Sequence, residues 1–156
     1  MLKLALPINR WIYLFVLAVF SSSVALSAPE EKHTYYVQLI RGNDEDQPAV
    51  PGAKAIGPKL SKSLHAVFRW KNYWEISRQE VSVAAGAKAK VVLSKERTVE
   101  IDLSQRNKRT VTAFSDRKPV GSTTQQAGNA MTIIGADRDV RSAWFVVVRR
   151  DKPQIE

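Results

Sequence analysis

The feature that most restricts the fold is the alternation of apolar and polar residues in short segments of the chain. In residues 97–104 the apolar residues Val99, Ile101 and Leu103 alternate with the polar residues Thr98, Glu100 and Asp102. Successive side chains of a β-strand point to opposite faces, so this period places every apolar side chain on one face. The segment predicts a strand with one buried and one solvated side.

Further segments rich in β-branched and aromatic residues follow about every ten residues and are separated by turn residues. The predicted strands are 34–41, 66–77, 88–93, 97–104, 109–115, 120–124, 131–134 and 143–150. The apolar parity reverses between Ile76 and Val81, which predicts a bulge or turn within 78–80. The loop 42–57 is too rich in acids, Pro and Gly to be a core segment, and it is long enough to be functional or mobile.

One short helix is predicted over residues 58–65, where Pro58 suits a helix start and Leu60 and Leu64 are one turn apart. Because strands dominate, the fold class is all-β: a single antiparallel β-sandwich of about seven to nine short strands with one possible short helix. A small closed barrel is the alternative. The continuous apolar run within 143–150 predicts a central strand covered on both faces. If that strand were at an edge, it could accept a strand from another chain.

The N-terminal residues predict export. Lys3 and Arg10 precede the apolar run 11–20, and small residues follow over 21–27, which is the layout of a signal peptide cleaved after Ser27. An uncleaved membrane anchor is the alternative. The division of the chain is therefore a leader over 1–27, a disordered N-terminus over 28–33, a sandwich domain over 34–150 and a polar tail over 151–156.

Composition narrows the chemistry and the compartment. The chain has no cysteine, which excludes disulfides, thiolate metal sites and a cysteine nucleophile. The leader holds two of the 24 basic residues and none of the 15 acidic ones, so the remainder has a net charge of +7. No asparagine after the leader begins a glycosylation motif. The lack of cysteines and of glycosylation motifs favours a bacterial cell envelope over a eukaryotic secretory compartment. The periplasm is the expected location.

An aromatic group over residues 68–74 could stack on sugar rings or bases. Phe68, Trp70 and Trp74 share the parity predicted to be buried, so most of the group is expected to fill the core. Tyr73 has the opposite parity, which makes it the aromatic residue expected at the surface as a ligand contact.

Basic residues form three groups that could attract an anionic envelope polymer if they converge in space. The candidate binding residues are Lys88, Lys90, Arg106, Lys108, Arg109, Arg149 and Arg150. The alternative interpretation is that each group covers a solvated face or turn. A binder of this kind should lose affinity steeply as ionic strength rises.

Metal binding and catalysis have weaker signals. Asp137 and Asp139 are the weak candidates for a calcium site, but Arg residues flank them, and backbone capping or pairing with Arg explains them better. Glu75 and Glu100 could form a carboxylate pair in one cleft if their strands brought them together. No motif of a known catalytic class is present, and no partner of His33 or His65 can be identified.

The sequence therefore predicts a non-enzymatic envelope protein that acts by contact with another envelope protein. The alternative is a module that binds an anionic or carbohydrate envelope component, and a hydrolase with an unrecognised site is a further alternative. No cofactor and no metal are expected. Nucleic acid is not an expected partner, and membrane contact is expected only if the leader is uncleaved.

Overall fold

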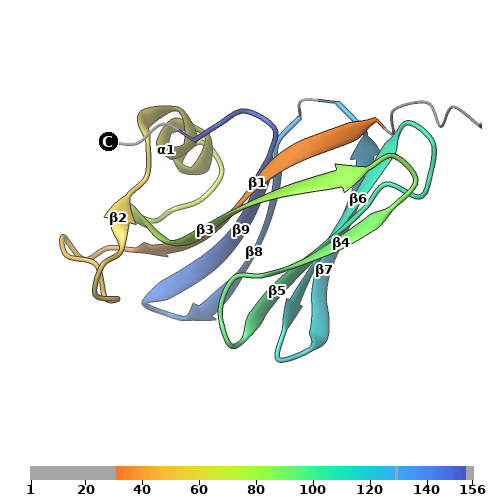
Figure 1. Ribbon diagram of the computed structural model, residues 1–156. Helices are drawn as coiled ribbons and strands as arrows, with labels where there is room; N and C mark the ends of the chain where they lie inside the picture. The colour runs from red at the N-terminus through yellow and green to blue at the C-terminus, as the bar shows by residue number, and fades with distance from the viewer. Residues whose placement is uncertain (1–30, 129, 154–156) are drawn as a thin grey trace, which may run out of the picture.

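The protein is an antiparallel β-sandwich with one short helix, as predicted (Figure 1). The computed structural model describes residues 31–128 and 130–153, so the predicted leader lies outside the described residues. Within those ranges no helix is long and apolar enough to cross a membrane. The described elements are β1 (Lys32–Asn43), β2 (Lys54–Ala55), α1 (Pro58–His65), β3 (Asn72–Ala84), β4 (Lys88–Val92), β5 (Arg97–Asp102), β6 (Lys108–Ser115), β7 (Lys118–Gln126), β8 (Thr132–Asp139) and β9 (Ser142–Arg149).

The strands form two sheets, one of five strands in the order β2-β3-β1-β9-β8 and one of four in the order β4-β5-β6-β7. All neighbouring strands are antiparallel. The four-stranded sheet is a simple meander, whereas β9 returns to lie between β1 and β8. The prediction for 143–150 is confirmed, since all eight residues of β9 are buried. Because β9 is internal to its sheet, it offers no edge to another chain.

The main core lies between the two sheets. Its buried residues come from the alternating apolar positions of both, including Val37 of β1, Val146 of β9, Val99 and Ile101 of β5 and Val111 of β6. Complete burial of such a side chain stabilises the fold by about 1.5–3 kcal/mol. Strand β5 therefore buries its apolar face in the core and turns its polar face outward, as predicted.

A second core covers the opposite face of the five-stranded sheet, where α1 lies (Figure 1). Leu60 and Leu64 of the helix pack against Ile40, Phe145 and Val147 of the sheet. The helix begins at Pro58, as predicted, with no side-chain cap on its first turn. The five-stranded sheet is therefore covered on both faces, and the four-stranded sheet on one.

Several predicted boundaries were wrong. Residues 66–71 are not part of a strand, because the chain must pass from the end of α1 back to the sheet before β3 begins. The bulge lies earlier than predicted: Leu39 pairs with Ser77 and Ile40 with Glu75, which leaves Ile76 as the extra residue. Residues 32 and 33 are ordered and extend β1, because they pair with Ala84 and Val83 of the long β3.

The last hairpin is also longer than predicted. Strand β8 continues to Asp139, so the expected loop of residues 135–142 shortens to a tight turn. There the Asp139 carboxylate accepts a hydrogen bond from the Arg141 backbone N–H at 2.8 Å. This bond lowers the pKa of Asp139. The contacts of Asp139 are those of a backbone cap.

Candidate interaction surface

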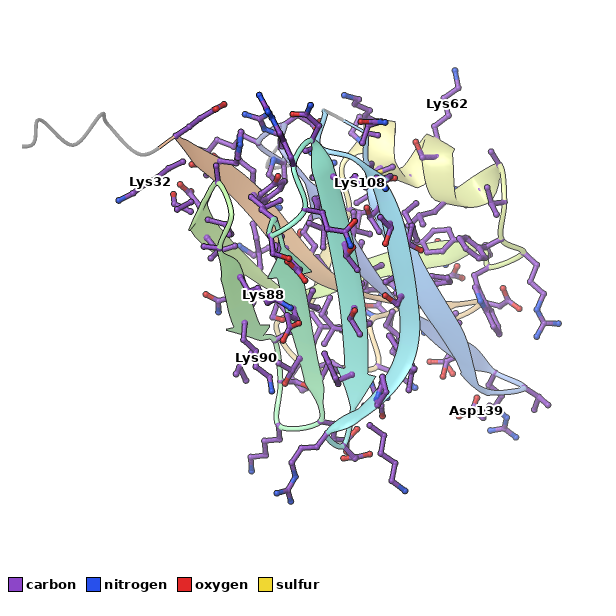
Figure 2. The ribbon with its side chains drawn as sticks, turned by 90° about the vertical axis from the view of Figure 1, so that its right-hand side faces the viewer. Lys32, Lys62, Lys88, Lys90, Lys108 and Asp139 are labelled. Carbon is purple, nitrogen blue, oxygen red and sulfur yellow. The ribbon has the colours of Figure 1, made fainter. Side chains whose placement is uncertain are left out.

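Among the described residues, one face of the four-stranded sheet is left uncovered by the two cores (Figure 2). Alternation on its strands turns one residue in two outward, and the register aligns these residues in rows across the sheet. One row holds Lys88, Asp102, Thr110 and Thr124, and the next holds Lys90, Glu100, Thr112 and Ser122. We call this surface the outer face.

Hydroxyl groups pair across the outer face. The Thr110 and Thr124 hydroxyl oxygens are 2.8 Å apart, and those of Thr112 and Ser122 are 2.9 Å apart. Each pair links β6 to β7, which fixes the side chains of this half of the sheet. The result is a flat, uncharged surface leading to the edge of the sheet.

The two lysines of β4 face acidic residues of β5. Lys88 Nζ lies 2.8 Å from Asp102 Oδ2, and Lys90 stands opposite Glu100 in the register. The hydrogen bond from Lys88, supported by bonds from Ser104, lowers the pKa of Asp102 to about 2. The same bond raises the pKa of Lys88. Both groups are therefore charged at neutral pH and largely neutralise one another.

A short apolar row crosses the lower end of the outer face. It runs from Val92 of β4 through Thr98 and Phe114 to Pro119 at the start of β7, with Val120 beside it. Val92 is 65% exposed and Val120 is 45% exposed. An exposed apolar row flanked by polar residues is typical of a surface that another protein covers.

The edge of this sheet at β7 has little protection. Strand β7 pairs with β6 on one side and, among the described residues, with no strand on the other. Residues 119–126 carry no charge. Natural edge strands are usually short or guarded by charges, proline or bulges. Here Pro119 and a bulge at Ala113/Phe114 guard the first third. Residues 121–126 have no strand paired to them beyond β6 among the described residues, although Gly121 lies close to Ile134 of β8 and Gln125 bonds to Thr132.

The other edges are better protected. Strand β2 has two residues, and β4 carries Lys88 and Lys90. The start of β8 is occupied by side chains, since Arg109 and Gln125 both donate hydrogen bonds to Thr132 Oγ1. The sequence prediction of residues 120–124 as a strand was correct but too short, and the edge itself was missed. The signal that could have found it is the uncharged run 119–126.

The predicted basic residues do not converge. Lys88 and Lys90 lie on the edge strand β4, while Lys108 is at the start of β6, two strands away and beyond the row that holds Lys88 (Figure 2). Arg106 and Lys108 are exposed and line an open cleft of about 510 Å³ with Glu31 and His33. Arg150 is half-buried. Of the exposed lysines and arginines in the predicted set, Arg106 and Lys108 line this cleft, whereas Lys88 and Lys90 do not.

Arg109 and Arg149 are buried, so their predicted surface exposure was wrong. Arg109 is 0% exposed, donates hydrogen bonds to Ala130 O and Thr132 Oγ1, and lies over the Tyr35 ring at 5.2 Å from its centroid. Burial lowers the pKa of Arg109. Arg149 is 4% exposed and donates from Nε to Asp151 O at 3.0 Å. A long aliphatic side chain with one anchored head can fill a core position, which periodicity does not reveal.

Tyr73 is also buried, contrary to the prediction of a surface residue. It is 4% exposed, and its hydroxyl group donates to Phe68 O at 3.3 Å. Its ring packs edge-on against Phe145 at 5.9 Å and against His65 at 4.9 Å. Burial raises the pKa of Tyr73. The prediction from alternation was wrong here because α1 covers the face of the five-stranded sheet that was expected to be exposed to solvent. Phe68 and Trp70 belong to the same core, as expected for most of the aromatic group.

The possible catalytic groups are held apart. Glu75 accepts hydrogen bonds from Gln38 and Arg78 in the five-stranded sheet, whereas Glu100 lies on the outer face of the other sheet, so the two share no cleft. His65 has Ser61 O at 2.8 Å from one ring nitrogen and Lys71 O at 3.1 Å from the other. Among the side chains that the structure describes, which do not include that of the metal candidate Asp137, no three from His, Asp and Glu lie where they could hold a metal ion.

The fold and surface define a class, a small antiparallel β-sandwich with a helix covering one sheet and an open edge on the other. Comparison of the chain with family models, with curated proteins and with solved structures finds no match.

Proposed function

We propose that the protein is an exported, non-catalytic component of the bacterial cell envelope that works by binding another envelope protein. The observation that carries this proposal is the open edge of β7, with its uncharged residues 119–126. Such an edge can add an extended strand from another chain, whose backbone hydrogen bonds supply affinity. The apolar row reaches this edge at Pro119 and Val120, which offer side-chain contacts that supply specificity.

The envelope location rests on the sequence of residues 1–27. N-terminal sequencing of the exported protein is the direct test, and a mature N-terminus at Ala28 is expected. An intact leader would favour the membrane anchor instead.

The binding mode is tested by crosslinking the processed protein in its own envelope and identifying co-purified proteins and glycans separately. The variant Thr123→Lys places an ammonium group on the edge strand, a device that natural proteins use to block strand addition. Thr123 is exposed, so the variant is expected to fold. The matched control is Ala66→Lys, which adds the same charge at the exposed end of α1.

We expect the control to retain the crosslinked protein and Thr123→Lys to lose it. Equal recovery by both variants, with melting curves like those of the unmodified protein, would contradict strand addition at β7.

The alternative partner, an anionic or carbohydrate polymer, would use Arg106 and Lys108 at the open cleft. Its support is weaker, because Lys88 faces Asp102 and Arg109 and Arg149 are buried. Ionic strength separates the two cases: polymer binding should fall steeply with salt, whereas a contact through backbone bonds and apolar side chains should change little. Recovery of a glycan and no protein, lost at high salt, would favour the alternative.

A further inference from the structure

A separate polar cavity lies on the far side of the five-stranded sheet, under the C-terminal segment. It has a volume of about 220 Å³ and is lined by Gln38 of β1, Arg149 of β9, Gly57, Lys59 and Leu60 at the start of α1, and residues 151–153. This volume corresponds to roughly seven water molecules. It is below the range of about 300–1,000 Å³ typical of drug-sized ligands, so a small group is the fitting occupant.

Gln38 brings an unused acceptor to this cavity. Its side chain is 2% exposed, and Nε2 donates to the Glu75 carboxylate. A carboxylate only accepts, so this contact fixes the orientation of the amide and leaves Oε1 as the free end. Among the described residues Oε1 has no hydrogen-bond partner. Buried amide oxygens are almost always paired, which indicates an occupant that carries an N–H or O–H group.

The lining of the cavity is also cationic. Arg149 is 4% exposed, and its Nε donates to Asp151 O at 3.0 Å. Lys59 and Lys152 add two further positive charges to the lining, against the single carboxylate of Asp151. Burial tends to raise the pKa of Asp151, but its contacts with Lys59 and Arg149 outweigh burial and lower the pKa overall. The lining therefore keeps an excess of positive charge.

The start of α1 also favours an anionic ligand in the cavity. The helix has Gly57 at its N-cap, no side-chain cap bond and no acidic residue in its first turn. The first N–H groups of a helix lack partners within the helix, and its dipole is positive at that end. Backbone donors of this kind bind carboxylates and phosphates. The cavity thus offers donors and positive charge near the single free acceptor of Gln38.

We propose that this cavity binds the carboxyl end of a peptide. The terminal carboxylate would lie between Arg149 and the start of α1, and the N–H of the last peptide bond would donate to Gln38 Oε1. A free protein C-terminus and the stem peptide of a cell wall share this chemistry and differ in the configuration of the last residues. The binding site does not depend on β7, and only the choice between these two sources depends on the proposed envelope location.

The first experiment measures binding of N-acetyl-alanyl-alanine to the processed protein by calorimetry, with its C-terminal amide as the matched probe. Loss of a charge-assisted carboxylate contact should weaken binding by about tenfold or more. The L,L and D,D forms of the acid distinguish the two sources. Equal affinity for the acid and the amide, or no binding at millimolar concentration, would overturn the proposal.

The second experiment tests the positive charge of the cavity lining. Lys59→Glu reverses a charge at the cavity, and Lys62→Glu makes the same change on the same helix outside it. Both lysines are exposed, so both variants are expected to fold. Binding should be lost in the first variant and kept in the second. Equal effects of the two would show a general attraction for anions and would overturn the site.

The third experiment tests the acceptor. An ester analogue of the dipeptide lacks the last N–H, so it should bind the unmodified protein several-fold more weakly than the amide-linked acid. In Gln38→Met the two probes should bind equally. A difference that persists in this variant would contradict the role of Gln38. Thr123→Lys should leave dipeptide binding unchanged, so this site and the proposed strand addition can fail independently.

Discussion

A single methyl group added at Gly135 should reveal how tightly the centre of the five-stranded sheet is packed. Gly135 of β8 pairs directly with Phe145 of β9, and the Phe145 ring lies over the glycine. A Cβ atom at Gly135 would lie 2.8 Å from Phe145 Cε1 and closer still to Cδ1. On the other side of β9, a Cβ at Gly42 would lie 3.0 Å from the same ring. The ring therefore occupies space that only glycine leaves free on both neighbouring strands.

The expected magnitude of Gly135→Ala combines two opposing effects. Overpacking of this kind costs about 1–3 kcal/mol, because the ring must leave its preferred rotamer or the strands must move apart. Replacing glycine restricts the unfolded chain and returns about 0.4–1 kcal/mol. The free energy of unfolding should thus fall by about 1–2 kcal/mol, which corresponds to roughly 3–12 °C in Tm for a domain of this size.

Urea denaturation followed by tryptophan fluorescence measures this effect as a lower midpoint with an unchanged slope. The matched control is Gly128→Ala, because a Cβ atom there would meet nothing within 4 Å. A cycle with Phe145→Leu should show coupling of at least about 0.5 kcal/mol, since the smaller side chain relieves the overlap. If Gly135→Ala and Gly128→Ala gave equal stabilities, the proposed packing of Phe145 over Gly135 would be refuted.

Three further predictions follow from the buried and paired residues. Tyr73→Ala should lower the free energy of unfolding by about 3–5 kcal/mol, as for other core aromatics, whereas a surface residue would cost little. Because the hydrogen bond from Lys88 lowers the pKa of Asp102 from 3.8 to about 2, its stabilisation is complete above pH 4 and is lost as the pH falls towards 2. Asp102→Asn should remove that part of the pH dependence, with a loss of at most about 1 kcal/mol at neutral pH, measured by urea titration at each pH. Arg109→Ala should cost about 3 kcal/mol or more by the same assay, because it empties a buried position and breaks two hydrogen bonds.

Periodicity predicted the strands well wherever only one face of a sheet is covered. The alternation in β5 has a single explanation, because its apolar side chains face the core and its polar ones face solvent. The continuous apolar run of β9 also had a clear consequence, since a strand that is apolar on both sides must be covered on both. The bulge at Ile76 was expected from the parity change nearby, and it was displaced by only a few residues.

The errors at Tyr73 and Arg149 share one physical cause, the cover on the second face of the five-stranded sheet. Tyr73 and Arg149 have the parity of exposed residues in a two-layer sandwich, but in this protein their face lies under the helix or the C-terminal segment. The helix itself was predicted from residues 58–65, yet nothing local says which sheet it covers. That choice depends on contacts between residues far apart in the sequence, such as Leu64 with Phe145.

The same asymmetry bears on function. Strand addition takes place at a sheet edge; in the five-stranded sheet β2 has only two residues and side chains occupy the start of β8, so β7 of the other sheet is the favoured edge. The exposed row that ends at Val120 lies beside that edge, so backbone and side-chain contacts could form together. The polar cavity at Gln38 lies beyond the covered sheet and would stay open while β7 is occupied. A single molecule could therefore bind a protein partner at β7 of the four-stranded sheet and the carboxyl end of a peptide in the cavity at Gln38. The two proposals together require that both ligands can bind at the same time.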